Sequence, residues 1–132
     1  MYDYNNNFLF EIKNGKGKGK EYDFYGKLNY EGEYLNGERN GNGKEYDDKN
    51  RIIFEGEFLK GKRWKGIIKE YDQKDRLQFE GELIKGKKNR IGKEYAFDRL
   101  IYEGEYLNGK RNGKVKEFYD AVDVYYSLIE NK

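Results

Sequence analysis

Apolar and polar residues alternate with a period of two in four segments of the chain. The apolar or glycine positions of these segments are Leu28, Tyr30, Gly32 and Tyr34; Ile52, Phe54, Gly56 and Phe58; Leu77, Phe79, Gly81 and Leu83; and Leu100, Tyr102, Gly104 and Tyr106. This period is typical of a half-buried β-strand. A second strand ends each unit at residues 43–46, 68–71, 92–95 and 115–118. Each unit is therefore predicted to be a β-hairpin.

The hairpins recur at a nearly fixed step, because the four mid-strand glycines are 24, 25 and 23 residues apart. Such self-similarity is the signature of a stacked repeat array. The sequence predicts an all-β, solenoid-like antiparallel meander of stacked hairpins. Its parts are a partial N-terminal repeat over 1–27, four repeats over 28–51, 52–76, 77–99 and 100–120, and a short C-terminal capping helix over 121–132. The helix is expected because Val122, Tyr125 or Tyr126, and Ile129 fall at helical spacing.

Residues that accept positive φ stand at both ends of every hairpin. The turn inside each hairpin, which we expect to be wide, carries Asn36-Gly37, Lys60-Gly61, Lys85-Gly86 or Asn108-Gly109. The return connection places Gly26, Asn50, Asp75 or Asp98 two positions before the next apolar side chain. These residue types adopt left-handed conformations at low cost. The mid-strand glycines predict close backbone approach, or a neighbouring ring lying across the gap.

Tyr-x-Gly-x-aromatic, followed by Asn-Gly-Lys-x-x-Gly and a glycine-containing second strand, resembles the MORN repeat. The resemblance covers residues 28–120, four times over. The chain departs from the family pattern where Asn40, Trp64 or Asn112 stands in place of a frequent His. Its connections are similar to those of MORN variants in some bacterial antitoxin-like proteins. The resemblance implies a non-catalytic scaffold or adaptor that binds a protein partner, with membrane association and an antitoxin-like role as alternatives.

Composition excludes much site chemistry, because the chain has no His, Cys, Pro or Thr, and Ser127 is its only Ser. Disulfides, thiolate nucleophiles, Ser-His-Asp triads and ordinary zinc sites are therefore excluded. We expect no enzyme activity, no cofactor and no metal site. Charged residues make up 39% of the chain, but 14 Tyr, 8 Phe and one Trp supply enough ring area for a core. Without an apolar segment or signal pattern, the expected location is the cytoplasm, with its inner membrane surface as an alternative.

Charge is informative by position, since the net charge is only +2. Basic residues gather near the hairpin turns: Arg39, Lys60, Lys62, Arg63, Lys65, Lys85, Lys87, Lys88, Arg90, Lys110, Arg111 and Lys114. They predict a basic edge that meets anionic phospholipid or an acidic protein surface, or that only aids solubility. Nucleic acid is not an expected partner. On the polar face, Glu33, Glu57, Glu82 and Glu105 are expected to form cross-strand pairs with Lys44, Lys69, Lys93 and Lys116.

The candidate partner-binding residues are Tyr34, Phe58, Trp64 and Tyr106, on a face that we expect to be grooved and aromatic. Trp64 is the only Trp and is expected in a turn one residue longer than its siblings. It is interpreted as a lid over a ring of the next repeat, or as an exposed anchor. The open strand edge at the amino end is available to pair with a second copy, so a homodimer is a further alternative.

Overall fold

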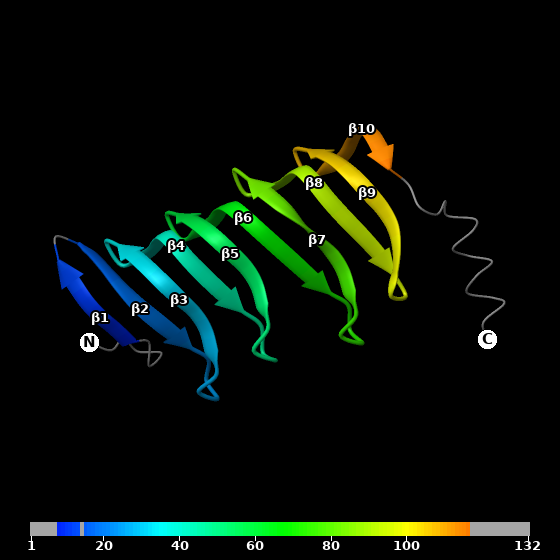
Figure 1. Cartoon of the computed structure of the whole chain (residues 1–132). Coiled ribbons are helices and arrows are strands. Elements are labelled where there is room, and N and C mark those ends of the chain that lie inside the picture. The colour runs from blue at the N-terminus through cyan, green and yellow to red at the C-terminus, as the bar shows by residue number, and fades with distance from the viewer. Residues whose placement is uncertain (1–7, 14, 117–132) are drawn as a thin grey trace. The chain divides into compact units, whose positions relative to one another are not determined.

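All elements in the described part of the chain are β-strands (Figure 1). The computed structural model describes residues 8–13 and 15–116. The ten strands are β1 (Phe8–Lys13), β2 (Lys16–Tyr22), β3 (Leu28–Leu35), β4 (Glu38–Tyr46), β5 (Ile52–Leu59), β6 (Lys62–Tyr71), β7 (Leu77–Ile84), β8 (Lys87–Ala96), β9 (Arg99–Leu107) and β10 (Lys110–Lys116). The predicted all-β hairpin meander is confirmed. The predicted helix over 121–132 and the start of the N-terminal partial repeat lie outside the described residues.

The chain forms two compact units, Met1–Ile67 and Ile68–Lys132. In the first unit, β1 to β5 pair antiparallel in chain order. In the second unit, β7 to β10 do the same. The register aligns glycines across neighbouring strands: Gly19, Gly32, Gly43 and Gly56 in the first unit, and Gly81, Gly92 and Gly104 in the second. The mid-strand glycines thus fall into line within each unit, as predicted.

The turns inside the hairpins are tight, so the prediction of wide turns was wrong. Asn36 and Gly37 both have positive φ, 51° and 82°, and the equivalent residues of the other hairpins match them. Two consecutive residues with positive φ make a type I′ turn, which suits the twist of the flanking strands. The residues that we expected to widen the turn lie instead within β4, where the β3–β4 register shifts between Gly32 and Tyr34. This irregularity makes room in β4 for residues that a regular hairpin would not accommodate.

An aspartate fixes the return connection between successive hairpins. In the first unit, Asp47 Oδ1 accepts from the backbone N–H groups of Lys49 and Arg51, each at 2.9 Å. Burial raises the pKa of Asp47, but these hydrogen bonds and the Arg51 guanidinium outweigh it, so the pKa is lowered overall. Asn50, next to this contact, has the predicted positive φ of 62°. Gly26, Asp75 and Asp98 have positive φ too, which confirms the predicted turn chemistry.

Rings on one face of the strands form the core of each unit. We call this the aromatic face; its buried residues include Tyr30, Tyr34, Phe54 and Phe58 in the first unit, and Phe79, Leu83, Tyr102 and Tyr106 in the second. Neighbouring rings meet edge to face, as Tyr30 does with Phe58 at a centroid distance of 5.0 Å. The rings also lie over the glycines, since a Cβ on Gly43 would fall less than 3.0 Å from the Tyr30 ring. The predicted ring over a glycine gap is confirmed.

Candidate functional site

A cation lies over the first ring of each repeat and completes the aromatic face. The guanidinium carbon of Arg39 lies 4.4 Å from the Tyr30 ring centroid. The equivalent pairs are Arg63 over Phe54 at 5.6 Å, Lys88 over Phe79 at 3.9 Å and Arg111 over Tyr102 at 4.1 Å. Cations favour the face of a ring, and the long aliphatic stems of these residues cover apolar surface.

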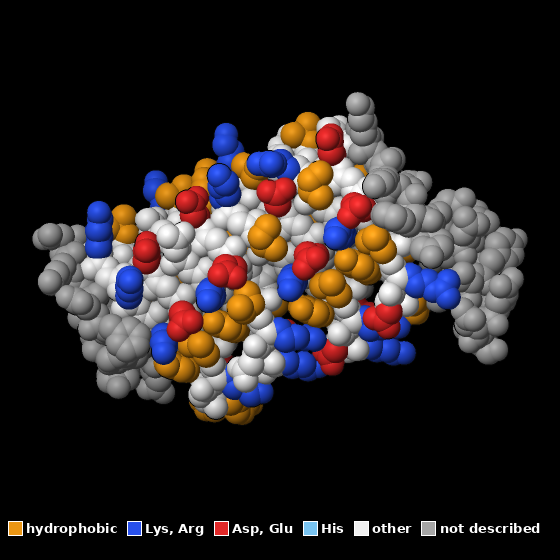
Figure 2. Space-filling model, in the orientation of Figure 1, with side chains coloured by type: hydrophobic (Ala, Val, Ile, Leu, Met, Phe, Trp, Pro, Cys, Tyr) orange, Lys and Arg blue, Asp and Glu red, His pale blue; other side chains and the backbone are white. Residues whose placement is uncertain are grey.

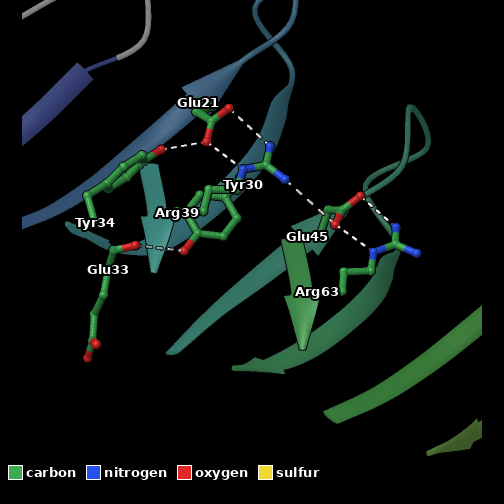
Figure 3. Close-up of polar contacts among 7 residues, drawn as sticks. All are labelled: Glu21, Tyr30, Glu33, Tyr34, Arg39, Glu45 and Arg63. Carbon is green, nitrogen blue, oxygen red and sulfur yellow. Dashed lines mark hydrogen bonds and ion pairs between the residues drawn. The ribbon is translucent and has the colours of Figure 1, made fainter. Parts of the chain in front are cut away.

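Each of these cations is held by a glutamate from the preceding hairpin. In the first unit, Glu21 accepts from Arg39 Nε at 2.7 Å and Nη2 at 3.0 Å (Figure 3). Glu45 accepts from Arg63 at 2.9 and 2.7 Å, and its Oε1 lies 3.7 Å from Arg39 Nη1. Glu21, Arg39, Glu45 and Arg63 therefore form one chain of alternating charge, which we call the charge ladder. Bidentate pairs of this kind are strong and geometrically specific.

The second unit repeats the arrangement. Glu94 accepts from Arg111 at 2.7 and 2.9 Å and from the Tyr106 hydroxyl. Lys88 Nζ donates to Glu70 at 2.9 Å. The hydrogen bonds from Arg111 lower the pKa of Glu94. Burial and the bond to Glu94 raise the pKa of Tyr106, so the phenol stays protonated while the carboxylate stays ionised.

The phenols of the first unit are similarly held neutral. Burial raises the pKa of Tyr30 to about 12. Burial and the hydrogen bond to Glu21, at 2.6 Å, raise the pKa of Tyr34. Both tyrosines therefore serve as hydrogen-bond donors over the whole physiological pH range.

The opposite face of the strands is charged and solvated (Figure 2). We call it the charged face; its cross-strand pairs are Lys20–Glu31 and Lys44–Glu55 at 3.8 Å, Lys69–Glu80 at 3.5 Å and Lys93–Glu103 at 3.4 Å. The expected pairing with the row that contains Glu33 was wrong, because the register sets Lys44 opposite Glu31 and Glu55. Glu33 instead accepts from the backbone N–H of Asn42 at 3.2 Å. Exposed pairs of this type add little stability.

A groove of about 900 Å³ lies on the charged face of the first unit. The side chains of Lys16, Lys18 and Lys20 line it from β2, and those of Glu31, Glu33 and Leu35 line it from β3. These residues alternate with Gly17, Gly19 and Tyr34, so they project from the side opposite to the buried rings. Lys20 pairs with Glu31, whereas Lys16 and Lys18 have no ion-pair partner among the described residues. Glu33 lies opposite Lys18 in the register, so the three lysines and two glutamates of the groove leave a small positive excess beside the aliphatic side chain of Leu35.

A family model for the MORN repeat matches residues 30–51 and 102–114. The two hairpins that contain these residues match the MORN repeat, and the other hairpins share their sequence pattern. MORN repeats are commonly scaffold modules that bind proteins or membranes, and the family is typically non-catalytic. No curated protein sequence matches the chain. Over the part of the chain that the structure describes, there is no cluster of His, Cys, Asp or Glu suited to a metal ion. Nor does that part contain an apolar helix of the length needed to cross a bilayer.

Three of the four predicted partner-binding rings are core residues of the MORN repeats. Tyr34, Phe58 and Tyr106 are only 8%, 3% and 6% exposed. The structure thus corrects the prediction that they present a binding surface, because each ring is already packed edge to face against another ring. The groove of the first unit lies on the charged face, so the prediction of a single grooved, aromatic face was wrong.

Trp64 lies on strand β6 and not in a turn, because the preceding turn consists only of Lys60 and Gly61. Its side chain is 37% exposed and makes no ring contact with another described residue. The structure therefore gives no support for a lid over a neighbouring ring. Trp64 remains a candidate anchor for a partner.

The predicted basic edge divides into two groups. Arg39, Arg63, Lys88 and Arg111 are held on the aromatic face by glutamates. The other group is solvated: Lys60, Lys62, Lys65, Lys85, Lys87 and Lys110 are exposed, and Arg90 is largely exposed, 3.8 Å from Glu82. The backbone of Lys114 belongs to β10, and its side chain lies outside the described part of the structure. These residues are spread over tight turns and strands, so only the second group is available to an anionic partner.

One exposed feature was missed at the sequence level. Phe24 and Tyr25, in the connection between β2 and β3, are 97% and 85% exposed. The same positions of the next two connections hold Asp48-Lys49 and Gln73-Lys74. The aromatic departure from these polar siblings is the signal that could have identified the pair.

Proposed function

We propose that this MORN-repeat protein is a non-catalytic scaffold that binds a protein partner through its charged face. The proposal rests on the difference between the two faces, one of which forms the packed core while the other is exposed to solvent. The rings, with their cations and glutamates, fill the aromatic face, and the charged face remains open to solvent. Within the first unit, that open face contains a groove in which Lys16 and Lys18 have no ion-pair partner among the described residues.

The groove favours an extended acidic segment that also carries apolar side chains. Lys16 and Lys18 supply positive charge, and Leu35 supplies aliphatic surface. Charge complementarity raises the association rate and excludes segments of the wrong sign. The Lys44–Glu55 pair on the same face of the first unit fits a partner with mixed charge.

Affinity capture from an extract of the source cells, read by mass spectrometry, tests this proposal. The double variant Lys16→Glu, Lys18→Glu should lose a partner that the natural chain retains. Lys62→Glu, Lys65→Glu is the matched control, because it changes the net charge equally at two exposed residues outside the groove. A partner captured equally by both variants, or lost from both, would show that the groove is not the binding site.

Peripheral membrane association is a second candidate, supported by the exposed lysines of the basic edge. Lys60, Lys62 and Lys65 are exposed in the first unit, and Lys85 and Lys87 in the second. Lysines near an anionic leaflet each contribute about 1 kcal/mol of attraction. Sedimentation with phosphatidylserine-containing vesicles should then fall at high salt and in Lys62→Glu, Lys65→Glu, but not in Lys16→Glu, Lys18→Glu. No sedimentation at low salt would reject this candidate.

A further inference from the structure

The connection between β2 and β3, at one end of that hairpin (Figure 1), carries two exposed aromatic residues, Phe24 and Tyr25. The Phe24 and Tyr25 rings meet edge to face at 5.6 Å, and both are almost fully exposed. Exposed aromatic rings of this size are typical anchors of protein interfaces. We therefore examine which surface could bind this pair of rings.

The turn that carries these rings is well braced. Asp23 Oδ1 accepts from the backbone N–H groups of Tyr25 and Lys27, each at 2.8 Å. Backbone bonds from Gly26 N to Asp23 O and from Asp23 N to Lys27 O close the turn at 3.0 and 2.7 Å. A pre-organised turn loses little conformational freedom on binding, so the rings are presented ready for contact.

Elsewhere in the described chain, even an exposed turn ring has a cation over it. Phe97, which is 52% exposed, lies under the Arg76 guanidinium at 4.7 Å. Within the same described residues, no cation lies over Phe24 or Tyr25. The surface that covers them is therefore expected to supply a cation together with apolar side chains.

The groove of the first unit offers this combination. Lys16 and Lys18 have no ion-pair partner there among the described residues, and Leu35 is the last residue of β3 before the tight turn. The aromatic pair stands at the other end of the same two strands, after β2 and before β3. One chain thus carries a protruding element at one end of the β2–β3 hairpin and a complementary groove toward the opposite end.

We propose that two copies of this chain associate, with the Phe24–Tyr25 turn of each copy seated in the Lys16–Lys18 groove of the other. Because the turn and the groove lie toward opposite ends of the hairpin, a two-fold axis would repeat the same contact in both directions, which is the isologous arrangement of most dimers. The inference uses the same groove as the proposed function, but purified protein tests it without the other partner. A partner that binds the groove would compete with the dimer.

Sedimentation velocity and light scattering of the purified chain, from micromolar to near-millimolar concentration, test the dimer. The natural chain should show a reversible dimer. The variant Phe24→Asp, Tyr25→Lys copies the polar residues of the next connection and should weaken association at least tenfold. Lys16→Glu, Lys18→Glu should have the same effect. The control Phe97→Asp should leave the dimer unchanged, and circular dichroism should show that all variants stay folded.

Three results would overturn the proposal. The first is a natural chain that is monomeric at every concentration. The second is a dimer that neither double variant weakens, which would place the interface elsewhere, such as at the β1 edge. The third is a monomer that binds phosphatidylcholine vesicles through Phe24 and Tyr25, which would make the pair a membrane anchor.

Discussion

At the scale of single residues, the aromatic face depends on positions that have no side chain. Gly43 lies under the Tyr30 ring, and Gly92 lies under the rings of Phe79 and Tyr106. The missing Cβ allows a bulky ring to lie flat on the backbone, so a single layer of strands can bury aromatic residues completely. Tyr30 reaches zero exposure in this way.

Gly43→Ala should therefore destabilise the fold by about 2 to 3 kcal/mol, because the added methyl overpacks the site beneath Tyr30. Denaturant unfolding followed by circular dichroism measures this cost. Gly61→Ala is the matched control: its Cβ meets no atom within 4 Å, although φ is +84°. That control should cost only about 1 kcal/mol, from backbone strain. Equal costs for the two variants would contradict the role of the ring.

Buried phenols predict a loss of stability in alkali. Burial raises the pKa of Tyr30 to about 12, above its ordinary value of 10.0. The folded state therefore binds its phenolic proton more tightly than the unfolded state does. Stability from this group should be complete below pH 10.0 and should fall as the pH rises towards about 12. Unfolding curves measured across this range should show the decline.

Tyr30→Phe provides the control for the alkaline transition. It removes the hydroxyl that donates to the Glu33 backbone oxygen at 3.0 Å, at a cost of about 1 kcal/mol near neutral pH. The variant should lose less additional stability in alkali than the natural chain. An identical alkaline decline would show that Tyr30 does not contribute to it.

At the scale of strands and hairpins, the charge ladder joins elements that are not direct neighbours in the sheet. Glu45 of β4 contacts Arg63 of β6, and it also lies near Arg39 of its own strand. The side chains of all three are mostly shielded from solvent, so each pair is stronger than the exposed pairs of the charged face. Loss of a single glutamate therefore affects two arginines.

Glu45→Gln should destabilise the protein by about 1 to 3 kcal/mol, because two partly buried guanidinium groups lose their common carboxylate. Glu57→Gln is the matched control, since Glu57 is exposed on β5 and has no ion pair among the described residues. It should change the free energy of unfolding by less than about 0.5 kcal/mol. Equal effects of the two substitutions, compared by urea denaturation, would rule out a stabilising ladder.

The hairpins and their glycine alignment could be predicted because both follow from local alternation and from turn chemistry. The ladder could not, because it depends on the bulge that sets Arg39 opposite Tyr34 while Gly43 stays opposite Gly32. Without knowledge of that register, the sequence predicts that the arginines belong to a solvated turn. The burial of Tyr34 was missed for a related reason. Alternation identifies the face on which the ring lies, but it does not show that Arg39 and Glu21 cover that face.

At the scale of the whole molecule, ring burial should dominate stability and charge should play a smaller part. Most pairs of the charged face are separated by 3.4 to 3.8 Å and are about half exposed. Salt screens such pairs, and each contributes less than about 1 kcal/mol. Raising NaCl from about 0.05 M to about 1 M should shift the free energy of unfolding in urea by less than about 1 kcal/mol. A larger decrease in the free energy of unfolding would show that surface ion pairs contribute substantially to stability.

The regular reach of the ladder has a consequence for how such a chain can change in length. Glu21, Glu45 and Glu70 each contact a cation 18 residues ahead, and Glu94 contacts one 17 residues ahead. Apart from the contact of Glu45 with Arg39 of its own hairpin, each glutamate pairs with the hairpin that follows it. A duplicated hairpin would contain its own ring, cation and carboxylate. Each cation and each carboxylate at the two junctions would therefore still have a partner of opposite charge. We therefore expect a chain with one whole hairpin added to remain able to fold.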